Sequence, residues 1–266
     1  MRVMPIRVTT GRSGWVQLKA SFKNNWTHYL QEALGLGIFM ISACYFSVLL
    51  WADQGAWHNT LPNDFTRFLI MGPLMGVTAL FIFYSPFTSP SGSHINPAVT
   101  ITFFRLGKMC QWDALFYVLF QFAGGVTGVY IMRQLLGHSL TGAPVRSAIT
   151  IPAEGDVTKS LFMESAIAFI TMTMVLFTSH HSTLKKYTRP FSGILVSIWV
   201  IIAGPVSGFG MNPARSFASS LIANDWTATW LYLLVPVAAM LLAAEFFLFI
   251  YHPKMGARKI FSRQHN

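Results

Sequence analysis

Long apolar stretches alternate with short polar connections along most of the chain. Six stretches are long enough, or nearly so, for transmembrane helices, and they cover roughly residues 29–51, 65–84, 114–136, 161–178, 188–206 and 230–251. A helix of about 20 residues rises about 30 Å, which is the thickness of the hydrocarbon core of a bilayer. The pattern therefore predicts an all-α membrane protein with six transmembrane helices.

Two further apolar segments are too short to cross a bilayer and too apolar for ordinary surface loops. One follows the sequence HINPA at 94–98 and the other follows GMNPA at 210–214, and each comes after a loop rich in small or turn-forming residues. Short apolar segments at corresponding places in two halves of a chain indicate re-entrant half-helices that enter the membrane from opposite faces.

The two halves of the chain repeat the same order of elements. Each half has a glutamate early in its first span, Glu32 or Glu164, followed by a second span, an Asn-Pro-Ala sequence and a third span. Three spans per half invert the second half relative to the first. We therefore predict an inverted repeat within a membrane domain at 29–251, with halves of about 29–136 and 158–251, in which the two half-helices meet near the midplane.

Basic residues collect at both ends of the chain, although only 11% of all residues are charged and 53% are hydrophobic. Residues 1–28 and 252–266 contain Lys and Arg but no acid. An excess of Lys and Arg beside a span marks the cytoplasmic side, so both segments are expected to be basic cytoplasmic tails. Because the net charge of +10 lies mainly around an apolar body, a nucleic-acid partner is the less favoured interpretation.

Nothing in the sequence indicates a cofactor, a metal site or an enzyme. Cys44 and Cys110 provide neither a disulfide framework nor the spacing of metal ligands, and the spans contain no nucleophile–base arrangement. The first 25 residues have no continuous apolar core, so the first long apolar stretch is expected to insert as a span without cleavage.

The two Asn-Pro-Ala sequences, Asn96-Pro97-Ala98 and Asn212-Pro213-Ala214, are predicted helix starts. Asparagine is a strong N-cap, and proline is favoured at the first helical position. If each side-chain oxygen caps its own helix, the amide N–H groups can face a pore. Each helix also directs the positive end of its dipole toward the same place, so the site favours neutral hydrogen-bonding solutes and repels cations.

The sequences SGSHINPAVT at 91–100 and GMNPARSFA at 210–218 closely resemble the two signature loops of aquaporins and aquaglyceroporins, the major intrinsic proteins. The resemblance extends over about 29–251 and includes Glu32, Glu164 and Gln121. It implies a passive channel domain for water, and for glycerol or other small neutral solutes, that excludes protons and ions. It also implies a homotetramer, with one pore per subunit, in the cell membrane.

The resemblance implies a second constriction beside the Asn-Pro-Ala pair. Arg215 matches its arginine, Phe209 matches its loop position and Val200 its position in the fifth span. In the second span, counting without gaps gives Gly76, and one extra loop residue gives Met75. Other interpretations stay open: helix packing for Gly76, a core or lipid-facing position for Val200, and an interface aromatic for Phe209.

Three other polar residues have roles implied by the same resemblance. His94 is expected to line the cytoplasmic vestibule, with a structural histidine as the alternative. Glu32 and Glu164 are acids within spans, where function is the default interpretation. In this family they are expected to accept hydrogen bonds from the two broken-helix loops and hold them still.

The residues that would select the solute give conflicting indications. Narrow water channels have Phe in the second span and His in the fifth, whereas this chain has Gly76 or Met75 and Val200. Phe209 beside Arg215 instead resembles the glycerol-conducting branch. That branch usually has Asp after the arginine, whereas this chain has Ser216; Tyr232 matches water channels and Leu233 glycerol channels. We expect water permeation with leakage of glycerol or similar solutes.

Three other functions are alternatives to a channel. A secondary transporter also uses inverted repeats and broken helices, but it would show saturable, gradient-coupled uptake. An intramembrane enzyme lacks candidate catalytic residues in this sequence. An adhesive or structural membrane protein would show no permeability in proteoliposomes.

Overall fold

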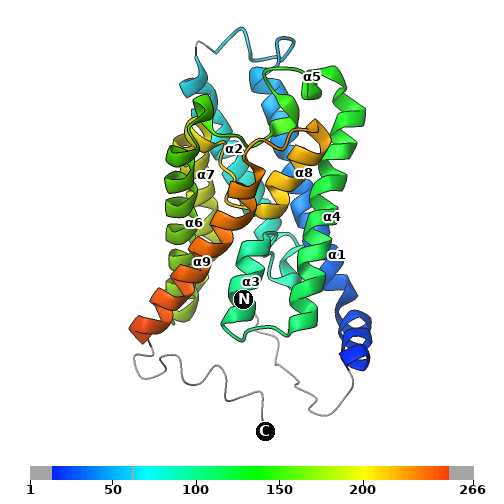
Figure 1. The fold of residues 1–266 in the computed structure, drawn as a ribbon, viewed down its shortest axis with the longest axis vertical. Helices are drawn as coiled ribbons and strands as arrows, with labels where there is room; N and C mark the ends of the chain where they lie inside the picture. Colours follow the sequence, from blue (N-terminus) through cyan, green and yellow to red (C-terminus); the bar gives the residue numbers. More distant parts are fainter. Residues whose placement is uncertain (1–13, 62, 252–266) are drawn as a thin grey trace.

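The computed structural model describes residues 14–61 and 63–251 as a bundle of helices (Figure 1), and no strand occurs in this part of the chain. Six helices are long and apolar enough to cross a membrane. They are α1 (Gly14–Trp51), α2 (Asp64–Tyr84), α4 (Gln111–Leu136), α6 (Val157–His180), α7 (Thr188–Ser207) and α9 (Thr229–Tyr251). The six predicted spans and the all-α fold are therefore confirmed.

Helix α1 begins much earlier than the sequence pattern predicted. It starts at Gly14 and not near Tyr29, so the predicted boundary between a tail at 1–28 and the membrane domain falls inside a continuous helix. The hydropathy pattern missed residues 14–28 because polar and basic residues interrupt their apolar positions. Residues 1–13 and the predicted C-terminal tail, 252–266, lie outside the described residues.

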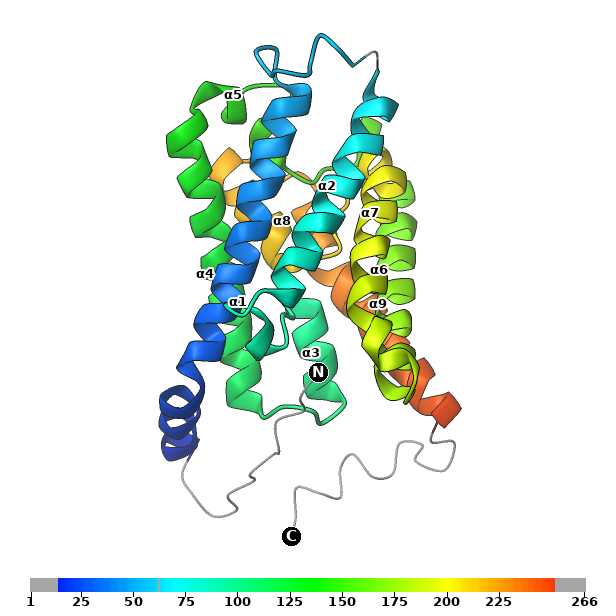
Figure 2. The same ribbon diagram turned by 180° about the vertical axis from the view of Figure 1, so that it is seen from behind.

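The helices pack in pairs that follow the predicted inverted repeat. In the first half α1 packs on α4, and in the second half α6 packs on α9, while α2 and α7 pack across the two halves. The two short helices are α3 (Pro97–Arg105), which packs on α9, and α8 (Pro213–Ala223), which packs on α4. Figures 1 and 2 show α3 and α8 in opposite ends of the bundle, and the start of α1 and the end of α9 at one end. We call this end the termini side and the opposite end the far side.

Glycines allow α1 and α4 to approach each other closely. A Cβ added to Gly124 would lie 2.5 Å from the Cα of Ala33, and one added to Gly128 would lie 2.6 Å from the carbonyl oxygen of Gly37. Neither position has room for a side chain, so the two backbones are in direct contact. Small residues spaced four apart are the usual means of such packing in membranes.

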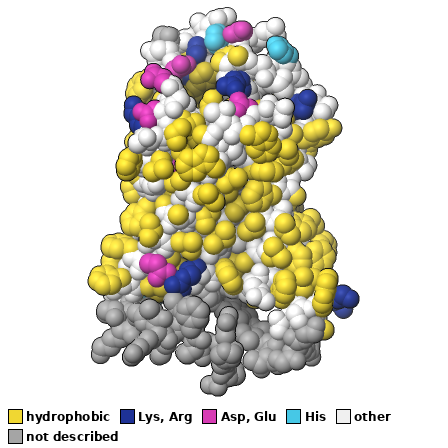
Figure 3. All heavy atoms as spheres, viewed as in Figure 1, with side chains coloured by type: hydrophobic (Ala, Val, Ile, Leu, Met, Phe, Trp, Pro, Cys, Tyr) yellow, Lys and Arg dark blue, Asp and Glu magenta, His cyan; other side chains and the backbone are white. Residues whose placement is uncertain are grey.

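The connections between the long helices contain several short turns and about half of the charged side chains of the described residues. The short elements are η1 (Ser89–Ser91), α5 (His138–Thr141), η2 (Arg146–Ala148), η3 (Ala153–Gly155) and η4 (Leu184–Tyr187). In Figure 3 charged side chains gather at the far side, and a broad hydrophobic band separates them from the Lys, Arg, Asp and Glu side chains nearer the termini side. This distribution is the one that a bilayer around the middle of the bundle requires.

An ion pair between Arg146 and Asp225 ties the far-side connection that follows α5 to the end of α8. The backbone N–H of Thr227 donates to Asp225 at 2.9 Å. That hydrogen bond, together with the Arg146 guanidinium, lowers the pKa of the Asp225 carboxyl below its usual value. The folded protein therefore favours the ionised carboxylate.

Asp225→Asn is expected to destabilise the protein by roughly 0.5 kcal/mol at pH 7, as for other ion pairs near a surface. Because the folded pKa is lowered, the contribution of Asp225 is complete above the usual carboxyl range and is lost as the pH falls through the lowered pKa. Unfolding midpoints of both proteins between pH 7 and pH 3 test this. A difference that grows on acidification would contradict it.

Candidate functional site at the paired half-helices

Each half-helix begins with an asparagine cap and a proline. Asn96 has extended backbone, and its side-chain oxygen accepts from the N–H of Ala98 at 2.9 Å. The side-chain oxygen of Asn212 accepts from the N–H groups of Ala214 at 3.1 Å and Arg215 at 3.3 Å. These bonds occupy N–H groups that a helix start otherwise leaves unpaired. The sequence prediction of two helix starts at these positions is therefore confirmed.

The two asparagines also join the loops to each other. Nδ2 of Asn96 donates to the carbonyl oxygen of Met211 at 3.0 Å, and Nδ2 of Asn212 donates to the carbonyl oxygen of Ile95 at 2.7 Å. Each bond therefore reaches the residue just before the other asparagine. A side-chain amide has two N–H donors, so each asparagine has a second N–H beyond this bond. The reciprocal pair brings the two helix N-termini together inside the bundle.

The two loops share an unusual backbone. Ser93 and Ile95 in the first loop and Phe209 and Met211 in the second have positive φ, between 42° and 53°. They occupy the same positions, three residues and one residue before each asparagine. Left-handed conformations are uncommon for such residues and persist only where the surroundings hold them. The repeat of this pattern indicates that both loops follow one inverted design.

Glu32 holds the first loop. Its carboxylate accepts from the Ser91 hydroxyl at 2.6 Å and from the backbone N–H groups of His94 at 3.0 Å and Ile95 at 2.5 Å. The side-chain amide of Gln121 on α4 donates to it at 2.8 Å. Glu32 is completely buried, and a buried carboxylate needs such donors.

Glu164 holds the second loop in the same way. Its carboxylate accepts from the Ser207 hydroxyl at 2.6 Å and from the N–H groups of Gly210 at 2.8 Å and Met211 at 2.5 Å. Glu164 is also completely buried. The glutamates of the two halves therefore fix equivalent serines and equivalent backbone segments.

Two tyrosines complete the repeat, and the sequence analysis did not assign them this contact. The hydroxyl of Tyr117 donates to the carbonyl oxygen of Ser91 at 2.8 Å, and that of Tyr232 donates to the carbonyl oxygen of Ser207 at 2.7 Å. Both serines precede an asparagine by five residues. This common spacing is the signal in the sequence that could have indicated the pair.

Arg215 lies in the first turn of α8 and is 8% exposed. One terminal nitrogen donates to the carbonyl oxygen of Ala148 in η2 at 2.9 Å. Its Nε has no hydrogen-bond partner among the described residues. Sequence reasoning missed Ala148, because a backbone acceptor in an irregular connection leaves no mark in residue type.

The other positions expected beside Arg215 are not all in one place. Val200, Phe209 and Met75 are 5%, 7% and 2% exposed and lie in the buried core of the bundle. Gly76 instead lies against α7, because a Cβ there would overlap the Ser197 hydroxyl. Gly76 therefore packs closely against α7, which is one of the interpretations that the sequence left open, and the adjacent Met75 is buried in the core.

His94 is partly buried beside the first half-helix. Its Nδ1 lies 3.2 Å from the Thr100 hydroxyl, and its ring stacks on Phe103 with centroids 4.9 Å apart. The ring of Tyr117 lies 5.4 Å away. These contacts fix the orientation of the imidazole on the termini side of the asparagine pair.

Glu245, which the sequence analysis did not assign to the site, forms an ion pair with Arg105. Their nearest atoms are 2.6 Å apart, and the pair joins the last turn of α3 to α9. A cation at a helix C-terminus also interacts favourably with the helix dipole. Glu245 therefore anchors the end of α3 that lies away from the asparagines.

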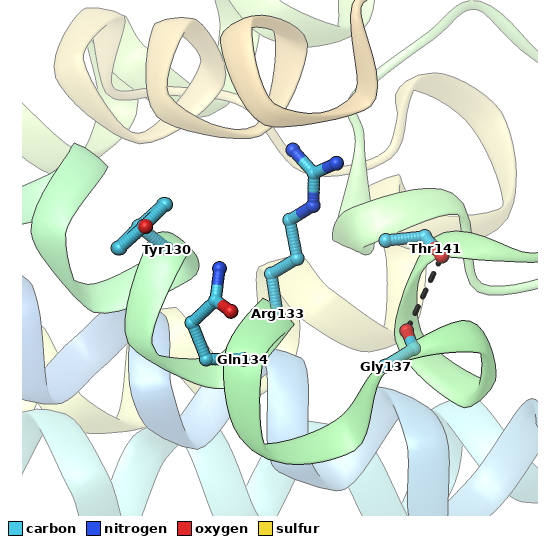
Figure 4. Close-up of a pocket in the computed structure, with 5 residues that line it drawn as sticks. All are labelled: Tyr130, Arg133, Gln134, Gly137 and Thr141. Carbon is cyan, nitrogen blue, oxygen red and sulfur yellow. Dashed lines mark hydrogen bonds between the residues drawn. The ribbon is translucent and has the colours of Figure 1, made fainter.

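A surface pocket of about 430 Å³ lies elsewhere, at the far end of α4. Figure 4 shows Arg133 pointing into it, and its lining residues are Tyr130, Arg133, Gln134, Gly137 and Thr141. The lining begins nine residues after Gln121 on the same helix, or about 14 Å along its axis. The pocket is therefore separate from the asparagine pair. Within residues 14–61 and 63–251, no cluster of three His, Cys, Asp or Glu side chains could hold a metal ion.

Fold and site together define a class: multi-span membrane proteins with an inverted repeat and two opposed half-helices capped by asparagines. Residues 19–247 match the family described as "Major intrinsic protein". The chain belongs to this family.

Several named proteins are similar to this chain. Aquaporin NIP1-3 of Oryza sativa subsp. japonica is 36% identical over 151 residues, which are 55% of this chain and 50% of that protein. Aquaporin-4 of Mus musculus is 24% identical over 253 residues, which cover 91% of this chain and 74% of that protein. The matched region thus spans about half the length of the rice protein.

A solved structure shows the same fold. The aquaglyceroporin from Plasmodium falciparum superposes with a TM-score of 0.70 at 19% identity, covering 85% of this chain and 97% of that one.

Proposed function

We propose that the chain forms a passive transmembrane channel for water and other small neutral solutes. The observation that carries the proposal is the reciprocal pair of bonds between Asn96 and Met211 and between Asn212 and Ile95. They bring two capped helix starts together within a bundle whose outer surface is apolar. The similarity to proteins named aquaporin and aquaglyceroporin supports the same conclusion.

The asparagine pair accounts for passage of neutral solutes. Each amide has a second N–H for the oxygen of a passing solute, while its own oxygen is occupied by the helix cap. Two helix N-termini add roughly one positive elementary charge at this point. A cation that loses its hydration shell there is repelled, whereas water exchanges one hydrogen-bond partner for another.

Arg215 is proposed to guard the pore on the far side of the asparagines. Its bond to Ala148 holds the guanidinium in place, and its other donors are available to a solute oxygen. A buried fixed cation also adds to the barrier for ions. Val200, Phe209 and Met75 would form the remaining wall, and Gly76 would not.

The proposed solutes are water together with glycerol or similar neutral molecules. Val200 and Phe209 give this wall apolar side chains, which suit the carbon backbone of a polyol better than a wholly polar constriction does. His94 is proposed to line the opposite vestibule.

Stopped-flow light scattering on reconstituted vesicles tests this function. With sucrose outside, vesicles that contain the protein should shrink much faster than empty vesicles. With glycerol outside, they should shrink and then quickly reswell. Shrinkage without reswelling would reject glycerol, reswelling without fast shrinkage would identify a facilitator whose main solute is not water, and saturable gradient-coupled uptake would indicate a transporter.

Met75→Ala is expected to raise glycerol permeability about three- to tenfold relative to water, which is the effect of lowering a barrier by about 0.7–1.4 kcal/mol. The reason is a wider wall beside Val200 and Phe209. Gly76→Ala is the matched comparison, since its Cβ would overlap Ser197. It should lower stability by about 1–3 kcal/mol without changing the glycerol-to-water ratio. If only Gly76→Ala changed the glycerol-to-water permeability ratio, Gly76 and not Met75 would be the residue that lines the pore wall.

Further expectations concern the assembly and its setting. We infer a homotetramer with one pore in each subunit, in the cell membrane, with both termini cytoplasmic. The orientation rests on the excess of Lys and Arg at the two ends of the sequence. The basic connections before α4 and α7, which contain Lys108, Lys185 and Lys186, favour the same side.

A further inference from the structure

The first turns of α1 extend past the length that a bilayer requires. The helix has 38 residues, or about 57 Å, whereas a hydrocarbon core is about 30 Å thick. The apolar part begins near Tyr29, so residues 14–28 lie beyond the hydrocarbon on the termini side. In Figures 1 and 2 these dark-blue turns bend away from the long axis of the bundle. We call residues 14–28 the N-terminal extension.

One face of the N-terminal extension is fixed to α4. Asp113 of α4 accepts hydrogen bonds from the Ser21 hydroxyl, from Nδ2 of Asn25 at 3.1 Å and from the hydroxyl of Tyr29, which follows the extension, at 2.5 Å. These three donors are four residues apart, so they share one face of the helix. Because this face is held, the opposite face of the extension has a defined direction.

The outward part of the N-terminal extension combines aromatic and basic side chains. Trp15 and Trp26 are 72% and 48% exposed, and their spacing of eleven residues places them in one row. Phe22 lies between them and is 43% exposed, but its ring packs against Phe116 of α4 with centroids 5.2 Å apart. Lys19 and Lys23 are also exposed and lie in the adjacent row. The extension contains no Asp or Glu.

We propose that the N-terminal extension binds anionic phospholipids in the leaflet on the termini side. It continues directly from a membrane span and bends away from the axis of the bundle (Figures 1 and 2), which keeps its side chains near the depth of the lipid headgroups. Tryptophan rings favour that depth because they have an apolar body and a polar N–H. Lys19 and Lys23 supply the charge that attracts anionic headgroups, and Asp113 holds the helix so that both rows stay at the surface.

The lipid proposal is tested on the full chain in detergent by native mass spectrometry, titrating phosphatidylglycerol and phosphatidylcholine with identical acyl chains. A lysine near an anionic surface contributes about fivefold in affinity, so the variant K19Q/K23Q should bind phosphatidylglycerol about 25-fold more weakly. Its affinity for phosphatidylcholine should stay unchanged. The variant W15A/W26A should weaken binding of both lipids.

The matched control is K185Q/K186Q, which removes two exposed lysines from η4 on the same side of the protein. Its loss of phosphatidylglycerol binding should be at least fivefold smaller than that of K19Q/K23Q. Equal losses would overturn the proposal, because they would show a general effect of net charge. Unchanged binding in K19Q/K23Q would overturn it as well.

Two measurements separate lipid binding from other causes. Unfolding midpoints without added lipid should be the same for K19Q/K23Q and the unmodified protein, since neither lysine has a hydrogen bond or ion pair within residues 14–61 and 63–251. A lower midpoint would assign the lysines to structure and reject the lipid site. If W15A/W26A changed the oligomeric state and left lipid binding unchanged, the aromatic row would contact a second copy of the chain, which would also reject it.

Discussion

Asn212→Asp is expected to convert the channel into one that conducts cations. The carboxylate keeps oxygens to accept from the N–H groups of Ala214 and Arg215, so α8 retains its cap. It places a full negative charge where two helix N-termini supply roughly one positive charge. At about 5 Å and an effective dielectric constant of about 20, that change lowers the barrier for a cation by about 3 kcal/mol. Sodium flux should rise by about two orders of magnitude.

Water flux through Asn212→Asp should fall at the same time. The variant loses the N–H donor that bonds to the carbonyl oxygen of Ile95 at 2.7 Å, and it loses the donor proposed to meet the solute. One neutral hydrogen bond contributes about 1 kcal/mol, so water permeability should fall about fivefold. Electrical recording and stopped-flow measurements on the same vesicles give both values.

Asn63→Asp is the control for Asn212→Asp. Asn63 caps α2 by accepting from the N–H of Thr66 at 2.9 Å, but it is exposed on the far side. The chemical change is the same, so the two variants differ only in location. Ion flux in both would mean that the charge acts on the membrane surface and not at the asparagine pair. No ion flux in Asn212→Asp would contradict the proposed position of the pore.

The helix starts could be predicted because their chemistry is local. Asn96 with Pro97 and Asn212 with Pro213 provide a cap and a first residue within two positions, and the structure has both caps. The spans could be predicted for a similar reason, since hydropathy over about 20 residues reports the solvent around a helix. The order of spans and half-helices then required an inverted repeat.

Contacts between distant segments could not be predicted in the same way. Tyr117 and Ala148 contact the site through bonds to Ser91 and Arg215. Glu245 holds the C-terminal end of α3 through its ion pair with Arg105. Nothing near them in the sequence specifies these partners, because tertiary packing selects them.

Two other features could not be predicted because they depend on how neighbouring helices pack: the orientation of Met75 and Gly76 on α2, and the residue at which α1 begins. Met75 and Gly76 differ by a rotation of about 100° around α2, and the close approach of Gly76 to Ser197 is the reason that we propose Met75 for the pore wall. The start of α1 depended on Asp113, which bonds to the side chains of Ser21 and Asn25 on turns that hydropathy alone does not predict. In both cases a neighbouring helix supplied the missing information.

Glu164→Gln is expected to destabilise and displace the second loop. The carboxylate accepts from Ser207, Gly210 and Met211, whereas a glutamine has one acceptor oxygen and an NH₂ group that cannot accept. At least one backbone N–H would then face another donor inside the bundle. Hydrogen bonds to charged groups contribute about 1.5–3 kcal/mol each, so the loss of at least one should cost about 1.5–3 kcal/mol or more.

The effect of Glu164→Gln on transport follows from the same bonds. Met211 accepts from Asn96 at 3.0 Å, so a displaced second loop also releases the cap residue of the first. Water permeability per folded channel should therefore fall together with the unfolding midpoint. Glu245→Gln is the control, because that acid is half-exposed and paired with Arg105, and it should cost less than about 1 kcal/mol. If Glu164→Gln changed neither quantity, the bonds from Glu164 would not be what holds the two asparagines together.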